Sequence, residues 1–386
     1  MKKVLKRIIK VIMVIFITIV IFVVGICIHG EIKAKEIKGV KEAKDYKEFC
    51  EIVKSSIINY DTSVAIRVKN YDESIYNIDL IKEIEFSTGA ETFEYNIKEL
   101  RVKEYGVLNP IMKIDFKYTN DPKELKRKDD IVDKKVKEIV SKVIKKDMKD
   151  YEKEKVLQDY LVKNCKYDKD SFNKGIFNKN NDAYSALINK FSMCQGYSQA
   201  MKKLLNEAGI ECKLVFGTII DEKEKDKKKL GHAWNMVKID GSYYHLDVTW
   251  NDTEKNHKEY NRYDFFNLTD EQIEKTRKWD RKKYPRCSSK KYTWKTLNLK
   301  DKMKDGTVVE NIRNYNELYN CIRRVINNRE NQISLKIIDY KENSYDIDQV
   351  VENIARPQNI GMSWKWSESK DIKTNVKYID CKLTYK

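Results

Sequence analysis

The first thirty residues differ from the rest of the chain in their pattern of apolar and charged positions. Residues 1–10, MKKVLKRIIK, carry five positive charges, and residues 11–28 contain no charged side chain. An uncharged run of this length can span a bilayer, and it exceeds the apolar region of most cleaved signal peptides. We therefore predict a cytoplasmic basic tail (1–10), a transmembrane anchor (11–29) and a linker (30–45), with the body outside the cell. A long cleaved signal peptide is the alternative, and it also exports the body.

Two distant segments share one order of apolar and polar positions. Residues 46–84 align without a gap on residues 315–353, and about a quarter of the positions are identical. The ends match as well, residues 114–119 with residues 379–384. Each copy predicts a helix, an alternating strand, a second helix and two further strands. We predict two copies of a small α/β module, at 46–119 and 311–386. Neither copy contains a histidine, which favours a binding or spacing role over catalysis.

The region between the two modules predicts a separate α+β core at 120–285, followed by a linker at 286–310. Its pattern indicates charged helices at 129–147 and 151–164, a helical turn at 183–188, and a helix that runs from the region of Cys194 to Glu207. Ser192 is a candidate N-cap for that helix, and Gly209 is a candidate C-terminal stop. A strand at 211–219 and an exposed loop at 221–229 precede a hairpin that turns at Asp240-Gly241.

The two-residue turn of this hairpin predicts its register. Ile239 then faces Ser242, and His232 lies opposite Thr249. Asp247 shares a face with His232 as its diagonal neighbour, about 7 to 8 Å away at the backbone. We expect this face to pack on the helix headed by Cys194. The same face also carries Trp234, Met236, Tyr243 and His245.

Cys194, His232 and Asp247 together form a candidate catalytic triad. A helix N-terminus and a neighbouring imidazolium both lower the pKa of a thiol, which favours the reactive thiolate. His232 could take the thiol proton and return it to a leaving group, while Asp247 would fix the imidazole tautomer. The backbone N–H of Cys194 could donate to a developing oxyanion.

Charge and cysteine content narrow the partners. Lys and Arg number 77 against 60 Asp and Glu, and the net charge of +17 favours an anionic membrane surface or wall polymer. Lysine is spread along the chain without a nucleic-acid-binding motif, so we expect no nucleic-acid partner. The eight cysteines show no CxxC pair or metal-ligand spacing. With Cys27 in the apolar span, an odd number remains for the exported body, so at least one thiol there stays unpaired.

Several single residues have simpler interpretations. Cys165 and Cys212 are predicted to be buried packing residues, and His245 a satisfied core histidine. Zinc held by His232, His245 and Asp247 is the alternative for the histidines, but these residues lack a usual ligand spacing. We therefore predict no metal and no cofactor.

The motifs of the core resemble the bacterial transglutaminase-like family, papain-fold proteins with a Cys-His-Asp triad. The resemblance rests on CQGY (194–197), GHAW (231–234) and LDVTW (246–250), and it extends from YLVKNCKYD (160–168) to YDFFNLTDEQIEKTRKW (263–279). It implies acyl chemistry at an amide, whether cross-linking, deamidation or peptide hydrolysis. Cys194 would be the nucleophile, His232 the base and Asp247 the orienting acid.

Two departures from animal members of this family are visible. Those enzymes carry a Trp before the nucleophile that helps to bind the oxyanion, whereas this chain has none before Trp234. Tyr184 or a nearby Asn could substitute. The chain also has no cluster of carboxylates typical of a calcium site. Downstream, Thr269 and Gln272 form a capping box that predicts the start of a last helix.

The resulting prediction is a membrane-anchored extracytoplasmic protein with a papain-like core between two small modules. Its expected function is thiol-dependent acyl transfer or hydrolysis at peptide or protein amides, with a cell-wall-associated substrate as one candidate. The alternative is a non-catalytic scaffold that retains the fold and binds partners through the flanking modules.

Overall fold

The computed structural model describes most of the chain in two compact units, Met1–Asp130 and Ile131–Lys386, which we treat separately. The described residues are 2–386 without 70, 73, 77–96, 107–109, 177–180, 221–230, 256–257, 304–306, 340–345 and 372–375. The predicted exposed loop at 221–229 therefore lies outside the described residues.

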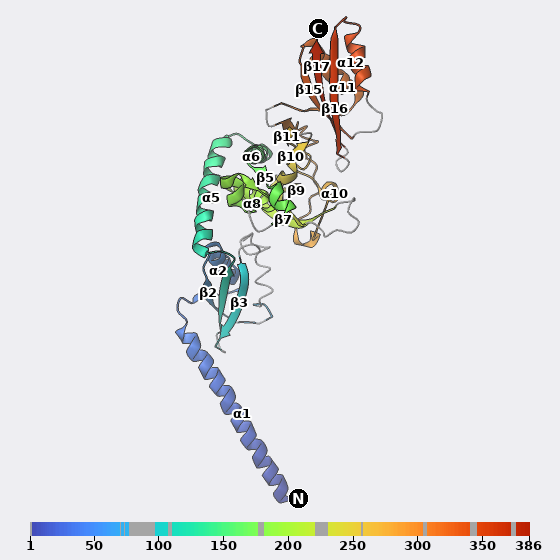
Figure 1. The fold of residues 1–386 in the computed structure, drawn as a ribbon. Coiled ribbons are helices and arrows are strands. Elements are labelled where there is room, and N and C mark those ends of the chain that lie inside the picture. The colour runs from blue at the N-terminus through green and yellow to red at the C-terminus, as the bar shows by residue number, and fades with distance from the viewer. Residues whose placement is uncertain are drawn as a thin grey trace. The chain divides into compact units, whose positions relative to one another are not determined.

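The first unit begins with a single long helix, α1 (Lys2–Glu36), drawn in blue in Figure 1. Its segment Ile9–Glu36 is long and apolar enough to cross a membrane, and most of its apolar side chains are exposed. This is consistent with either a signal anchor or a signal peptide. The helix continues through Gly30 and beyond the predicted span because Glu31, Lys33 and Lys35 are good helix formers, and neither Pro nor Gly occurs between Glu31 and Lys38.

A four-stranded sheet with one described helix follows in this unit. Asp45 caps the helix by accepting a hydrogen bond from the N–H of Glu48, and Phe49, Val53 and Ile57 form its buried stripe. The strand order is β1-β2-β4-β3, with β1 parallel to β2 and the other pairs antiparallel. The elements are β1 (Lys41–Ala43), α2 (Tyr46–Ile58), β2 (Ser63–Val68), β3 (Ile97–Tyr105) and β4 (Ile111–Tyr118).

The second unit ends in a sheet with the corresponding order, β14-β15-β17-β16. Again the first pair is parallel and the others are antiparallel. Two helices pack on it, and their buried positions recur at helical spacing. The elements are β14 (Glu310–Ile312), α11 (Tyr315–Asn327), β15 (Gln332–Ile338), α12 (Ile347–Ala355), β16 (Met362–Asp371) and β17 (Val376–Tyr385).

Register allows a closer comparison of the two sheets. Lys41 pairs with Ile66 in the first sheet, and Glu310 pairs with Leu335 in the second. These pairs are equivalent when the gapless alignment is extended to the preceding strands. The predicted match of residues 114–119 with residues 379–384 is wrong by two residues. It aligns Asp115 with Asp380. Ser63 pairs with Asp115, however, whereas its counterpart Gln332 pairs with Lys382. The second helix predicted for the first copy lies outside the described residues, and the repeat stays a prediction.

The central region combines helices with an antiparallel sheet ordered β12-β7-β8-β9. Helix α8 packs against β7 and β8, and α6 packs against α8. The large apolar core of this region lies between these helices and the sheet. The main elements are α5 (Pro122–Val143), α6 (Asp150–Asn164), α8 (Cys194–Glu207), β7 (Cys212–Ile219), β8 (Gly231–Ile239), β9 (Ser242–Leu246) and β12 (Arg277–Trp279).

Short elements complete this region. Thr269 and Gln272 do form the predicted capping box, but the helix that they open has only four residues, and Arg277–Trp279 then forms a strand. The short elements are β5 (Lys166–Tyr167), α7 (Lys169–Asn173), the π-helix η1 (Ser185–Asn189), β6 (Phe191–Ser192), α9 (Val248–Asn251), β10 (Asp252–Lys255), β11 (Lys258–Asn261), α10 (Asp270–Ile273), the 3-10 helix η2 (Arg281–Lys283) and β13 (Lys302–Met303).

The β8–β9 hairpin has the predicted turn and register, but it is shorter than predicted. Asp240 and Gly241 both have positive φ, and Ile239 pairs with Ser242. The ladder ends at Asn235–Leu246, so the predicted pairing of His232 with Thr249 is wrong. Asp247 leaves the strand because its side chain caps α9, accepting a hydrogen bond from the N–H of Trp250.

Buried charges connect the C-terminal sheet to the central region within the second unit. Lys336 of β15 is fully buried, and its Nζ lies 2.7 Å from Asp264 Oδ1 and 2.9 Å from Asp301 Oδ2. Arg262 binds Asp264, and the Tyr378 hydroxyl donates to Asp301 Oδ2 at 2.6 Å. The positive charges of Arg262 and Lys336 thus balance the negative charges of the two aspartates in a buried site.

Candidate active site

Cys194 is the first residue of α8, and its side chain is partly buried. The predicted N-cap at Ser192 is wrong, because that residue belongs to β6 and pairs with β5. Met193 holds the cap position in an extended conformation without a side-chain cap bond. Asn181 supplies a cap from the preceding loop instead, where its Oδ1 accepts from the N–H of Gly196 at 3.3 Å. The sulfur therefore sits at the positive end of the helix macrodipole.

Gly196 permits close packing around this helix start. A Cβ added at Gly196 would lie 2.0 Å from Ser192 Oγ and 2.6 Å from the carbonyl oxygen of Asp182. Both separations are too short for any side chain, so only glycine lets β6 and the Asp182 backbone approach the first turn of α8.

His232 is buried on β8, the strand against which α8 packs. Its Nε2 lies 2.7 Å from Asp247 Oδ2, and its ring is also hydrogen-bonded to the Cys194 thiol. Because Nε2 is engaged by the carboxylate, Nδ1 is the ring nitrogen left for the sulfur. The structure thus brings the three predicted residues together in the order Cys194, His232, Asp247.

Asp247 is fully buried and accepts hydrogen bonds on both of its oxygens. Oδ1 accepts from the N–H of Trp250 at 3.2 Å, and Oδ2 meets Arg277 Nη2 at 2.7 Å in addition to His232. The backbone N–H of Asp247 donates to the carbonyl of Phe265 at 3.0 Å. The carboxylate is therefore oriented independently of the histidine that it supports.

Arg277 is a site residue that the sequence analysis did not single out. It lies on β12, is 1% exposed, and stacks over Trp250 with its guanidinium carbon 4.0 Å from the ring centroid. A single Arg in a basic chain gives no local signal. It reaches Asp247 only because β12 pairs with β7, a contact that residue spacing does not predict.

The charges of this group shift its ionisation toward an ion pair. Burial raises the pKa of the Cys194 thiol, but the hydrogen bond and charge of His232 outweigh it, and the net pKa is lowered. Burial lowers the pKa of His232, but Asp247 outweighs it and raises that pKa to about 9. For Asp247, burial is outweighed by His232 and Arg277, which bring its pKa to about 2. These shifts favour the thiolate–imidazolium form of the pair, beside a carboxylate that stays ionised.

Several further residues surround the candidate triad. Asn235 is buried on β8, and its Nδ2 donates to the carbonyl of Ser198 in α8 at 2.9 Å, which fastens the helix to the strand. Tyr167 of β5 is half-buried, and burial, followed by the charges of Cys194 and Asp247, raises its pKa. Tyr184 precedes η1 and packs against the core, and its suggested role at the oxyanion stays a prediction.

The simpler predictions for the other candidates are confirmed. Cys165 and Cys212 are buried core residues, and burial raises the pKa of Cys212 to about 12. His245 is fully buried with both ring nitrogens hydrogen-bonded. All eight cysteines fall among the described residues, and none forms a disulfide there.

In this α+β region a cysteine-headed helix packs on an antiparallel sheet that bears the histidine. Residues 137–248 match the model of the transglutaminase-like superfamily, a range that includes Cys194, His232 and Asp247. The chain therefore contains a transglutaminase-like superfamily domain. No curated protein gave a significant match.

Solved structures with similar folds agree only loosely with this chain. A TGase structure is 16% identical with a TM-score of 0.28, covering 57% of this chain and 61% of that one. A candidate cysteine protease from Cytophaga hutchinsonii is 13% identical with a TM-score of 0.25, covering 39% and 62%. A candidate protease from Parabacteroides distasonis is 9% identical with a TM-score of 0.22, covering 83% and 65%. The chain thus covers less than two thirds of each of these structures, and we base nothing further on them.

Proposed function

We propose that this protein carries out thiol-dependent acyl transfer or hydrolysis at peptide or protein amides. The observation that carries the proposal is the hydrogen-bonded line from Cys194 at the head of α8 through His232 to the buried carboxylate of Asp247. In the proposed roles Cys194 is the nucleophile, His232 the proton carrier and Asp247 the residue that orients and charges the imidazole.

The first half of the proposed reaction forms a thioester. The Cys194 thiolate attacks the amide carbonyl carbon, and a C–S bond forms while the carbonyl electrons move onto oxygen. The backbone N–H of Cys194, which has no intrahelical partner in the first turn, is the proposed oxyanion donor. The oxyanion then collapses, the C–N bond breaks, and His232 gives its proton to the leaving nitrogen.

The second half regenerates the thiol group. Water or an amine attacks the thioester, His232 takes a proton from the attacking atom, and the C–S bond breaks to release Cys194 as thiolate. Asp247 remains ionised throughout, since its pKa of about 2 lies far below that of the imidazolium that it stabilises.

The proposed location is the outer face of a membrane, held there by α1. The apolar helix with its basic N-terminal side and the net charge of +17 support this placement, and an anionic cell envelope would attract such a body. A protease added to intact cells should therefore cleave the body. Cleavage by a protease in the cytosol, and not by one added outside, would contradict this placement.

Alkylation of Cys194 tests the chemistry without knowledge of the substrate. The full chain in detergent is treated with iodoacetamide across pH, and each cysteine is followed by peptide mapping. Cys321 is an internal reference, because it is partly buried and burial raises its pKa. We expect Cys194 to react about tenfold or more faster than Cys321 at pH 6, since its thiolate is stabilised.

The variant His232→Ala should remove this advantage, because it deletes the partner that lowers the thiol pKa. If Cys194 reacts no faster than Cys321 and His232→Ala changes nothing, the enzyme proposal fails and the scaffold alternative is favoured. Incubation with a Gln peptide, with and without an added amine, then separates transfer from hydrolysis by the product formed.

A further inference from the structure

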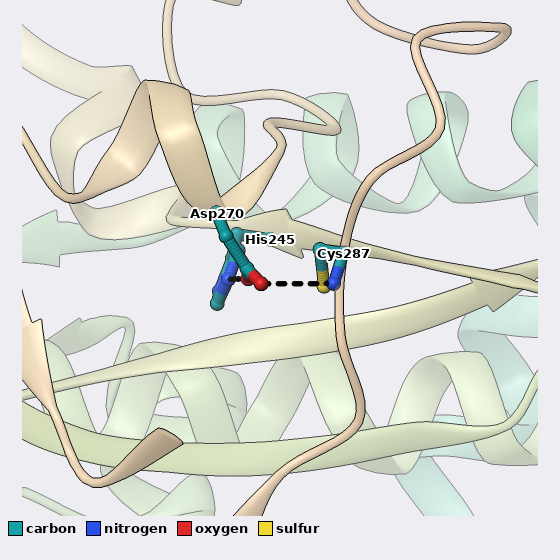
Figure 2. A group of neighbouring side chains, drawn as sticks. All are labelled: His245, Asp270 and Cys287. Atoms are coloured by element: carbon teal, nitrogen blue, oxygen red, sulfur yellow. Dashed lines mark hydrogen bonds and ion pairs between the residues drawn. The ribbon is translucent and has the colours of Figure 1, made fainter.

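A second group of reactive side chains lies one strand away from the proposed triad. His245 of β9, Asp270 of α10 and Cys287 of the following loop place a nitrogen, an oxygen and a sulfur within 4.8 Å of one another (Figure 2). His245 and Cys287 are buried, and Asp270 faces a cavity of about 680 Å³ that Cys287 also lines. The proposed reaction uses none of these three residues, although their types are those of a zinc site.

The hydrogen bonds of His245 argue against a metal at this group. The indole Nε1–H of Trp234 points at His245 Nδ1 at 3.0 Å, and an indole nitrogen can only donate. Nδ1 must therefore present its lone pair, so the neutral ring carries its proton on Nε2. Nε2 donates to Asp270 Oδ1 at 2.8 Å (Figure 2). A metal ion needs a lone pair at this nitrogen, where the tautomer places a proton.

The second oxygen of Asp270 is also engaged. Its Oδ2 accepts from the backbone N–H of Cys287 at 3.2 Å, and the Cys287 thiol is hydrogen-bonded to the same carboxylate. Burial lowers the pKa of His245 despite the opposing effect of Asp270, which favours the neutral ring. The group thus behaves as a directed chain of hydrogen bonds that begins at Trp234.

Trp234 connects this chain to the proposed triad. Its indole stacks on the imidazole of His232, with ring centroids 5.9 Å apart and planes 20° apart. Gly217 of β7 pairs with His232 on one side and with Trp279 on the other, so it shares their face of the sheet. A Cβ at Gly217 would lie 2.7 Å from the Trp234 ring, so the indole occupies the space that the glycine leaves open.

His232 requires such a support. Asp247 and Cys194 hold its two ring nitrogens, and Trp250 contacts the ring with centroids 6.4 Å apart at 67°. The near-parallel contact with Trp234 adds a restraint on the tilt of the ring plane, which keeps Nδ1 directed at Cys194. The indole is itself held at its edge by His245 and is contacted by Trp279, whose ring centroid lies 6.1 Å away at 90°.

We propose that His245 and Asp270 are positioning residues of the active site, which fix the plane of Trp234 and through it the orientation of His232. This inference rests on the proposed function, because it assigns the two residues a role in the reactivity of Cys194. A site of this kind must hold its reacting groups within about 0.5 Å and 10–20° of the productive geometry, and a second layer of hydrogen bonds supplies that restraint.

Two substitutions at one position test the proposal. His245→Leu removes the acceptor for the Trp234 indole, whereas His245→Asn keeps an acceptor close to the position of Nδ1. We expect His245→Leu to slow Cys194 alkylation at pH 6 about tenfold and to move the alkylation profile to higher pH, because His232 no longer stabilises the thiolate in one orientation. His245→Asn should recover most of the rate.

The matched control is Tyr244→Phe, on the same strand with its side chain on the opposite face. It removes a partly buried hydrogen bond to Ser289 Oγ of 2.6 Å without touching Trp234. It should lower the thermal stability in the manner of His245→Leu and leave the alkylation profile of Cys194 unchanged. If Tyr244→Phe slows alkylation as much as His245→Leu does, the effect is general destabilisation and the positioning role is overturned.

Two further measurements address the hydrogen bonds directly. With ¹⁵N-labelled tryptophan, the indole resonance of Trp234, identified by Trp234→Phe, should shift upfield in His245→Leu and return in His245→Asn. Addition of Co²⁺ to the wild-type chain should give no thiolate-to-cobalt absorption band. A band that disappears in Cys287→Ser would show that the cluster binds metal through the other tautomer, and it would overturn the proposal.

These results can be separated from failure of the proposed function. A wild-type Cys194 that reacts no faster than Cys321 contradicts the proposed function itself. A fast wild-type Cys194 whose alkylation is unchanged by His245→Leu contradicts only the positioning role.

Discussion

Asp247 shows how one residue combines a structural and a proposed chemical role. Its carboxylate caps α9 through Trp250, pairs with Arg277 and holds His232, all without access to water. The cap explains why the chain leaves the β8–β9 ladder at this point. The ion pair explains why a buried carboxylate stays ionised, and so why the pKa of His232 can be raised to about 9.

Replacing Asp247 by Asn should change the pH dependence of the reaction as well as its rate. His232 is protonated below its pKa, so a step that needs the imidazolium persists to about pH 9 in the wild type and is lost above it. Without the carboxylate that pKa falls, and the alkaline limb of kcat/KM should move to lower pH. Turnover of a Gln peptide should fall by about 10²- to 10⁴-fold.

The control for this substitution removes the charge that it leaves unpaired. Asp247→Asn alone leaves the Arg277 guanidinium buried without a carboxylate, which destabilises the fold. The double variant Asp247→Asn with Arg277→Met should regain urea stability but not the alkaline limb. A double variant with wild-type pH dependence would mean that Asp247 acts only through stability.

At the scale of elements, the start of α8 depends on close packing more than on a side-chain cap. Met193 gives no cap bond, and Gly196 accepts the Ser192 side chain and the Asp182 backbone at distances that no side chain tolerates. The position of Cys194 therefore depends on an element, β6, that contributes none of the proposed reacting groups.

Gly196→Ala should move this element and with it Cys194. We expect a loss of about 1–3 kcal/mol in the free energy of unfolding, because the added methyl group overlaps backbone atoms, together with slower alkylation of Cys194. Urea unfolding followed by circular dichroism measures the first effect. Gly231→Ala is the control, since a Cβ there meets nothing within 4 Å. Equal urea midpoints for the two variants would contradict this account.

The hairpin shows how much of the site could be predicted from the sequence. Asp240-Gly241 fixes a local geometry, so the register from Asn235 to Ile239 followed from two residues. The point at which pairing between β8 and β9 ends could not be predicted, because a helix cap at Asp247 competes with strand pairing and the sequence is compatible with either. The Cys-His-Asp grouping was accessible because the order of the motifs is a local property, but the predicted diagonal pairing of His232 with Asp247 did not form, since Asp247 lies beyond the paired strand.

Residues that reach the site through long-range strand pairing could not be predicted from the sequence. Arg277 acts on Asp247 only because β12 adds to the far edge of β7, and the segment that contains it has the pattern of a helix continuing from Thr269. Likewise Asn181 caps α8 from a loop whose conformation no periodicity indicates. Such residues become visible only when the tertiary fold is known.

At the scale of the whole second unit, a balanced buried charge cluster holds the C-terminal sheet. Lys336 comes from β15, while Asp264 and Asp301 come from the central region. Removing one member of such a cluster leaves a charge without its partner in a site that excludes water, and this costs far more than an exposed ion pair contributes.

Lys336→Met should therefore reduce the free energy of unfolding by about 3–5 kcal/mol. Lys365→Met, at an exposed position on β16, is the matched control and should change it by less than about 0.5 kcal/mol. Urea unfolding of the full chain, followed by tryptophan fluorescence, compares the two variants. Indistinguishable midpoints would show that the cluster does not stabilise the unit.

The ion pair between Asp247 and Arg277 also sets how short a fragment can be while it still contains the complete candidate site. The stretch that matches the superfamily ends at residue 248, so it holds every proposed reacting group and stops short of Arg277. A fragment trimmed to that stretch would keep the signature by which such domains are identified and lose the permanent counter-charge of its carboxylate. In this chain the unit that the proposed chemistry needs is thus longer than the stretch that matches the superfamily.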